Sequence, residues 1–258
     1  MRIVLTAAVV AAAIQAASWH LTDRAVAPAD LETPIDYVSY SPYLQGEDPR
    51  THRQTIPAEQ IESDLAAIAN VAQGVRVYST IDGIDQVPAI AAKLGLNVIV
   101  GSWVGDTDER DRSELDEVVQ IAKQHRNVRS VLVGNEVLTR AERTPDELIA
   151  LIQKAKKQVR VPVSTGEIWN IWLEQPKLVR AVDFMAVHIL PYWEGVAPDQ
   201  AVSYTLDKIE LLKRTYPGKR IVVTEFGWPS QGYNRMDAAP SQLSQAEIIR
   251  DFVAEAER

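Results

Sequence analysis

Apolar, β-branched runs alternate with amphipathic stretches along the chain from residue 35 onward. The run from Leu96 to Gly101 is apolar at nearly every position, which is typical of a parallel strand buried on both faces. The pattern predicts strands at residues 35–41, 74–80, 96–102, 128–135, 161–167, 182–189 and 220–226. It predicts helices at residues 57–72, 85–94, 113–126, 145–158, 173–180, 199–215 and 242–257.

Polar residues mark where several of these helices begin. Thr144 is followed by Pro145 and, three positions on, by Glu147, which together predict a capping box at the start of a helix. A weaker signal of the same kind at Ser113 predicts that an earlier helix begins there, and Ser241 lies near the start of the last one.

Seven strand–helix units in succession favour a (β/α)8 TIM barrel over an open sheet. No Gly-x-Gly-x-x-Gly turn follows any predicted strand, which argues against a dinucleotide-binding fold. The sequence stops at Arg258, at the end of the last predicted helix, so the barrel is expected to be truncated before its eighth strand. A fragment is a simpler interpretation than an unusual closure. The predicted barrel domain covers residues 30–258.

The N-terminus has the features of an export signal. Met1 and Arg2 precede an apolar run from Ile3 to Ile14, and small residues follow. This run is shorter than the ~20 residues of a comfortable transmembrane helix. We therefore expect residues 1–20 to be a signal peptide or a membrane anchor, and the protein to be periplasmic, extracellular or membrane-anchored. The alternative is an Ala-rich helix that packs against the domain.

Charge and cysteine content exclude several classes of function. The net charge is −8, which argues against nucleic acid or anionic lipid as a partner, because both attract clustered Lys and Arg. With no Cys, the chain has no disulfide, no thiolate zinc site and no Cys nucleophile. A neutral substrate fits this composition, and we expect a monomer.

Acids and aromatic residues gather where the predicted strands end. In parallel barrels functional side chains lie at this end, so these residues are expected to line one cleft. Aromatic faces stack on pyranose rings, and a pair of carboxyl groups can hydrolyse a glycosidic bond without a metal or a cofactor. We therefore predict a sugar site with no metal and no cofactor. The residues are Tyr40, Tyr43, Tyr78, Trp103, Asn135, Glu136, Glu167, Trp169, His188, Tyr192, Trp193, Glu225 and Trp228.

Two motifs carry a resemblance to a known family. Val133-Gly134-Asn135-Glu136 and the run Val223–Ser230 (Val-Thr-Glu-Phe-Gly-Trp-Pro-Ser) resemble the two active-site signatures of glycoside hydrolase family 17. The Ser-Tyr-Ser-Pro-Tyr segment at residues 39–43 is similar to the bacterial members. The resemblance covers residues 35–258. It implies a retaining enzyme on a (β/α)8 barrel that hydrolyses or rearranges β-1,3-glucan.

The resemblance also implies roles for individual residues. Glu136 would be the acid/base and Glu225 the nucleophile, with Asn135 binding a sugar hydroxyl. Tyr192 would hydrogen-bond Glu225, and Trp228 would line the sugar cleft. In a retaining enzyme the two carboxyl groups lie ~5–5.5 Å apart. We expect the pKa of Glu136 to be raised by burial and by the second carboxylate.

Other strand-end residues have competing interpretations. Tyr40, Tyr78 and Trp103 are predicted to bind substrate because of their position alone. Glu167 and His188 could bind substrate or form structural pairs in the core. The acidic run 106–111 resembles a calcium loop only superficially, since it lacks the required Gly, and is interpreted as a solvated loop that opens a helix.

Two alternative functions stay open. The chain could be a non-catalytic glucan-binding or regulatory domain of a larger glucan synthase, although the intact glutamate pair disfavours this. It could also be a retaining glycosidase of the same clan that acts on β-1,4-glucan or mannan, although the Glu-Phe-Gly-Trp-Pro-Ser sequence disfavours that.

Overall fold

Seven parallel strands form one sheet that curves into a barrel wall. The computed structural model describes residues 28–44, 46–47, 55–105 and 107–256; the predicted signal or anchor at residues 1–20 lies outside them. The strands pair in chain order, each with the next. They are β1 (Val38–Ser39), β2 (Gly74–Arg76), β3 (Asn97–Ser102), β4 (Val128–Asn135), β5 (Val163–Ile168), β6 (Met185–His188) and β7 (Ile221–Glu225).

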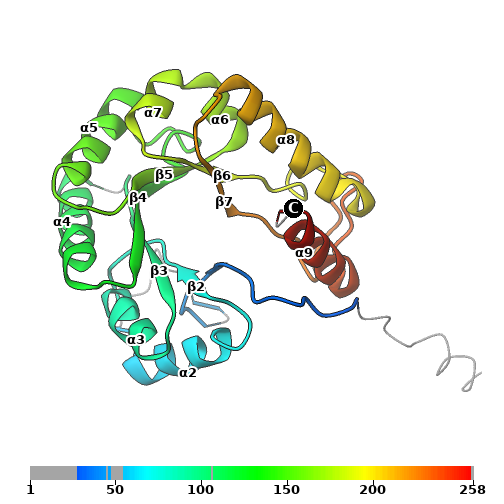
Figure 1. Ribbon diagram of the computed structural model, residues 1–258, viewed down its shortest axis with the longest axis horizontal. Helices are drawn as coiled ribbons and strands as arrows, with labels where there is room; N and C mark the ends of the chain where they lie inside the picture. Colours follow the sequence, from blue (N-terminus) through cyan, green and yellow to red (C-terminus); the bar gives the residue numbers. More distant parts are fainter. Residues whose placement is uncertain (1–27, 45, 48–54, 106, 257–258) are drawn as a thin grey trace, which may run out of the picture.

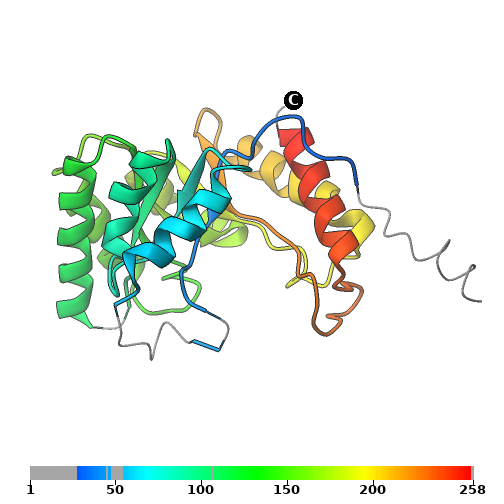
Figure 2. The same cartoon turned by 90° about the horizontal axis from the view of Figure 1, so that it is seen from below.

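The helices lie outside the strands, as Figures 1 and 2 show, and a helix follows each strand along the chain. This is the arrangement of a (β/α)8 TIM barrel, as predicted. The α-helices are α2 (Ala58–Ile68), α3 (Val87–Lys93), α4 (Asp108–Gln124), α5 (Pro145–Lys156), α6 (Trp169–Glu174), α7 (Pro176–Ala181), α8 (Ala201–Thr215) and α9 (Gln242–Ala256). Short 3-10 turns, η1 (Ile84–Gln86) and η2 (Pro198–Gln200), precede α3 and α8.

Helix starts follow local capping chemistry. Thr144 and Glu147 form the predicted capping box at the start of α5. The predicted start of α4 at Ser113 is wrong, because Thr107 caps the helix by accepting a hydrogen bond from the Arg110 N–H. The helix predicted at 173–180 is two helices, since Pro176 begins a new one.

The main core lies between the strands and the surrounding helices. Leu65 of α2, Leu115 of α4 and Leu148 of α5 are fully buried there. Strand β3 is buried from Val98 to its end, which confirms the prediction of a strand buried on both faces. The strands thus form a rigid wall that fixes the positions of the residues at their ends.

The barrel wall is open between β7 and β1. In the part of the chain that the structure describes, no strand pairs with the free edges of these two strands. A cavity of about 690 Å³ lies there, lined by Tyr37, Val222 and Phe252 among others. The described residues therefore supply seven strands of a (β/α)8 barrel. Among these same residues, no helix is both long and apolar enough to cross a membrane.

Candidate active site

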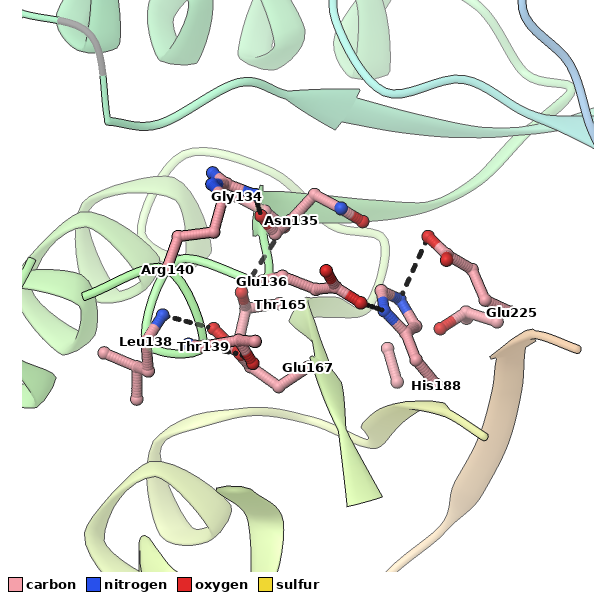
Figure 3. Close-up of polar contacts among 12 residues, drawn as sticks. Gly134, Asn135, Glu136, Leu138, Thr139, Arg140, Thr165, Glu167, His188 and Glu225 are labelled. Carbon is pink, nitrogen blue, oxygen red and sulfur yellow. Dashed lines mark hydrogen bonds and ion pairs between the residues drawn. The ribbon is translucent and has the colours of Figure 1, made fainter. Parts of the chain in front are cut away.

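The two predicted catalytic glutamates face each other across one histidine (Figure 3). Glu136 directly follows β4, while His188 and Glu225 end β6 and β7. His188 Nδ1 lies 2.9 Å from Glu136 Oε1, and His188 Nε2 lies 3.4 Å from Glu225 Oε1. One atom from each of the three side chains lies within 4.8 Å of the others. The prediction that the two glutamates face each other is confirmed.

Glu136 is held in an unusual backbone conformation. Its φ is +53°, in the left-handed region, and its N–H donates to the Gly166 carbonyl of β5 at 2.7 Å. Gly134, two residues earlier, has φ +83°, and a Cβ there would lie 2.4 Å from Val137 Cγ2. The end of β4 therefore requires glycine at position 134, and the turn that follows directs the Glu136 side chain into the site.

Arg76 of β2 joins the cluster, and our sequence analysis missed it. Its Nη1 donates to Glu225 Oε1 at 2.9 Å and to the Thr224 carbonyl at 2.8 Å. Its Nη2 donates to Asn135 Oδ1 at 2.6 Å. The guanidinium therefore orients both the Glu225 side chain and the Asn135 amide. A charged residue inside the apolar run of β2 was the signal that could have revealed it.

The pKa of Glu136 is lowered, which corrects our expectation. The hydrogen bond from His188 is the largest cause and outweighs the effect of burial, which would raise the pKa; Arg140 and Arg76 lower it further. The prediction failed because it counted the second carboxylate and burial but not the imidazole between the glutamates. In the free protein this arrangement favours an ionised Glu136.

His188 does not contact substrate as predicted, because its side chain is fully buried and both ring nitrogens face charged neighbours. Arg76 Nη1 also lies 3.3 Å from His188 Nε2. Glu136, His188 and Glu225 could each offer a ligand atom to a cation. The Arg76 guanidinium already lies against two of these groups, and its positive charge opposes a metal at this place.

Glu167 has a structural position rather than the predicted substrate contact. It is fully buried, and its carboxylate accepts hydrogen bonds from the Leu138 and Thr139 N–H groups and from the Thr139 hydroxyl. Burial raises the pKa of Glu167, and these hydrogen bonds oppose the shift. The residue fixes the loop that begins at Glu136, as Figure 3 shows.

Tyr192 does not make the predicted hydrogen bond to Glu225. Its hydroxyl donates to the Tyr233 carbonyl at 2.6 Å, and a phenol has only one proton to donate. Trp228 is also buried, and its indole N–H donates to the Ala239 carbonyl. Its ring packs edge-on against Tyr192 at 5.8 Å between centroids. These two side chains support the loop after β7, and both also line a shallow cavity beside it, so the role of Trp228 in the cleft stays a prediction.

The remaining predicted substrate residues separate into two groups. Tyr78 belongs to the site: its ring lies 4.3 Å from the Arg76 guanidinium, and its hydroxyl hydrogen-bonds with Glu225. Tyr40 does not, because it is buried and its hydroxyl donates to Asp64 of α2. Trp103 is half-buried and stacks on the guanidinium of Arg140, whose Nη1 donates to the carbonyl of Asn135. It therefore borders the site.

Exposed aromatic side chains lie on the loops that follow two strands of the site. Trp193 and Tyr233 are 53% and 65% exposed, on the loops that follow β6 and β7. A shallow cavity of about 350 Å³ lies between these loops, lined by both side chains and by Leu190 and Pro229. This surface offers flat apolar faces on the loops that follow the strands ending in His188 and Glu225.

The predicted solvated loop at 106–111 needs correction at its end. Asp106 lies outside the described residues, and α4 already begins at Asp108. Asp111 is buried, accepts a hydrogen bond from the Gly105 N–H and pairs with Arg143 at 2.7 Å. The Asp111 carboxylate is therefore bound by protein groups and is not part of a solvated loop.

Solved structures show the same fold. A glycoside hydrolase family 17 β-1,3-glucanosyltransferase from Rhizomucor miehei superposes with a TM-score of 0.74 at 22% identity, covering 86% of this chain and 82% of that one. A family 113 β-1,4-mannanase is similar at a TM-score of 0.54 and 21% identity, over 77% of this chain and 79% of the other. At these identities the likeness concerns the fold.

Sequence relatives point to one family of domains. The chain is 28% identical over 208 residues to a probable glucan endo-1,3-β-glucosidase btgC of Aspergillus terreus, covering 70% of this chain and 30% of the relative. It is 27% identical over 229 residues to a probable β-glucosidase btgE of Aspergillus fumigatus, covering 84% and 39%. These relatives are fungal, so the likeness to bacterial members stays a prediction. The family model of the BtgE/BtgC glycoside hydrolase domain matches residues 37–258. The chain therefore belongs to the BtgE/BtgC glycoside hydrolase domain family, on a barrel that it shares with family 17.

Proposed function

We propose that this chain is a retaining glycosidase of β-1,3-glucan, with Glu136 as acid/base and Glu225 as nucleophile. The observation that carries the proposal is the convergence of the two carboxyl groups, which each contribute an atom to a set lying within 4.8 Å. Retaining enzymes need a separation of about 5–5.5 Å, whereas inverting enzymes need about 6.5–9.5 Å to admit a water molecule.

The substrate class follows from the relatives and from the surface of the site. The two fungal relatives are named as probable glucosidases, one of them for β-1,3-glucan, and a mutant of the Rhizomucor enzyme was solved in complex with laminaritriose. The exposed rings of Trp193 and Tyr233 suit the apolar faces of glucose units. The chain spans less than half the length of those relatives, so the activity of the whole proteins does not transfer automatically.

The contacts give each group a role in a double displacement. Arg76 pairs with Glu225 at 2.9 Å and orients its carboxylate, which attacks the anomeric carbon and forms a glycosyl ester. Glu136 gives a proton to the departing oxygen and later takes one from the acceptor hydroxyl. Asn135, whose amide Arg76 orients, binds a sugar hydroxyl next to the anomeric carbon in this proposal.

Rescue of alanine variants by azide tests these roles. Glu225→Ala with azide should give an α-glycosyl azide, since the anion replaces the nucleophile. Glu136→Ala with azide should give a β-glycosyl azide, because the anion attacks the glycosyl ester. Glu174→Gln, at an exposed position of α6, is the control and should behave as the wild type. Rescue of neither alanine variant, or products of the opposite configuration, would refute the assignment.

The acceptor decides between hydrolysis and transfer to a second sugar. A sugar held on the Trp193 and Tyr233 surface would compete with water at high effective concentration. We propose that transglycosylation accompanies hydrolysis. Millimolar laminari-oligosaccharide should then give some products longer than the substrate. A time course with only shorter products would leave a plain hydrolase.

The open side of the barrel favours one alternative function. Because the wall is unpaired between β7 and β1 in the described residues, the site could bind glucan without turning it over. Binding of laminari-oligosaccharide by calorimetry, together with no product and no glycosyl ester on Glu225, would support a glucan-binding domain instead.

A further inference from the structure

The charges around His188 define how many protons the site holds. Glu136 and Glu225 reach the imidazole from β4 and β7, and Arg76 reaches it from β2. Two carboxylates and one guanidinium leave one uncompensated negative charge. Arg140, which also acts on Glu136, is paired with Glu142, so one additional proton is favoured in the group around the fully buried ring.

This proton has two places along one hydrogen bond. It can lie on Glu136 Oε1, with His188 neutral and protonated at Nε2, or on His188 Nδ1, with the imidazole positively charged and Glu136 ionised. The two atoms are 2.9 Å apart, so the proton can pass directly between them. Imidazole is the side chain that gains and loses a proton near neutral pH.

We propose that His188 holds the catalytic proton in the free enzyme and passes it to Glu136 as the glycosidic bond breaks. The proposal rests on the proposed function and gives it a proton source. His188 does not touch substrate and acts through Glu136. The lowered pKa of Glu136 agrees with this arrangement, because a carboxyl that is ionised at rest needs a neighbour that supplies its proton.

The step balances in atoms and charge. A Glu225 oxygen forms a bond to the anomeric carbon, and the bond to the departing oxygen breaks with its electron pair. That oxygen takes a proton from Glu136, which receives the Nδ1 proton of His188. The imidazole is left neutral, with a proton on Nε2 that faces the new ester. Glu225 has lost its charge as His188 loses its own, so the group stays neutral overall.

The position of the His188 ring is set by the neighbouring strand β5. Gly166 of β5 lies against the imidazole, and a Cβ there would meet His188 Nε2 at 2.7 Å and Arg76 Nη2 at 3.1 Å. The same residue accepts the Glu136 N–H through its carbonyl. Thus β5 leaves space for the His188 ring and fixes the backbone of Glu136, which exchanges the proton with it.

Nitrogen NMR of the wild-type protein tests the proposal directly. The full chain labelled with ¹⁵N-histidine contains four histidines, and His188 is assigned by its loss in His188→Asn. Near neutral pH both ring nitrogens of His188 should have imidazolium shifts. After reaction with 2,4-dinitrophenyl 2-deoxy-2-fluoro-β-laminaribioside, the shifts should become those of a neutral ring protonated at Nε2.

The same sample separates two kinds of failure. If mass spectrometry finds no adduct on Glu225, the proposed function fails. If the adduct forms and the His188 shifts do not change, or if His188 is neutral in the free protein, the proton proposal fails and the proposed function stands. A folded His188→Asn variant is needed only to assign the signal. The matched control for this assignment is His125→Asn, at a distant half-buried position.

Kinetics of His188→Asn give an independent readout. The amide can still donate to Glu136 but cannot hold a titratable proton. Hydrolysis of laminari-oligosaccharide should fall by about 10²-fold or more, while an activated dinitrophenyl glycoside should change by less than about tenfold. The alkaline limb of the pH profile should move roughly one to two pH units lower, toward the range of a carboxyl group. Equal losses on both substrates with an unchanged pH profile would show a merely structural role and overturn the proposal.

Discussion

Replacing Glu167 by Gln tests the loop that carries Glu136. The carboxylate of Glu167 receives three donors on two oxygens: the Leu138 N–H on one, and the Thr139 N–H and hydroxyl on the other. A glutamine amide keeps one acceptor oxygen and turns an NH₂ group toward the other donors. The Thr139 hydroxyl can rotate and accept, but one backbone N–H loses its partner.

The size of the effect follows from this count. A buried donor left without a partner costs about 1–3 kcal/mol. Removing a buried charge offsets part of this, because burial raises the pKa of Glu167 and thus disfavours its ionised form. The cost of the lost hydrogen bond exceeds the gain from removing the buried charge. We therefore expect Glu167→Gln to destabilise the protein by about 2 kcal/mol. For a chain of this size the melting temperature falls roughly 2–4 °C per kcal/mol.

Activity should respond in a particular way. Because Glu167 is fully buried and reaches substrate only through the loop, kcat should fall about 10- to 100-fold while KM changes little. Urea unfolding and steady-state kinetics on laminari-oligosaccharide measure the two effects, with the exposed Glu174→Gln as control. Unchanged stability together with a raised KM would mean that Glu167 contacts substrate after all, and would refute the structural assignment.

Three further changes have defined outcomes. Gly134→Ala should destabilise the protein by about 1–3 kcal/mol and abolish most activity, since a Cβ there meets Val137 at 2.4 Å. A variant that matched the wild type in both thermal melts and kinetics would contradict this. Tyr192→Phe should shift the pH–rate profile very little but lower the melting temperature, because the lost hydrogen bond goes to the Tyr233 carbonyl. A displaced acidic limb would instead show that Tyr192 acts directly on Glu225. The lowered pKa of Glu136 stabilises the fold above the ordinary carboxyl pKa, and this stability is lost as pH falls through the folded value. Urea unfolding from about pH 6 to pH 3 should therefore weaken the wild type more than Glu136→Gln, and parallel losses would argue against the shift.

The sequence predicts the barrel well because its strands are buried on both faces. Every predicted strand overlaps an observed one, although β1 is only Val38–Ser39 within the predicted 35–41 and β5 ends one residue beyond the predicted 161–167. The convergence of Glu136 and Glu225 also follows from the chain, since parallel strands in a barrel end at one rim. Arg76 was missed because the strand was predicted to run to residue 80, which placed Arg76 in its interior, whereas β2 ends at Arg76.

Side-chain partners were harder to predict than positions. Tyr192 follows β6 as expected, but whether its hydroxyl faces Glu225 or the Tyr233 carbonyl depends on the path of the loop after β7. Tyr40 stands at a strand end yet points to Asp64 of α2, because side chains alternate between the two faces of a strand. The pKa of Glu136 likewise depends on a contact between strands far apart in sequence.

The left-handed backbone at Glu136 has a consequence for how this chain can change over time. A side chain with a Cβ costs roughly 1–2 kcal/mol in that conformation, and glycine or asparagine would relieve much of it. Random substitution under selection for folding alone would therefore replace the glutamate. A copy of this domain that had lost its chemistry, and was kept only to hold a glucan or a partner, would be expected to lose its carboxylate at this position early and to become more stable as it did so.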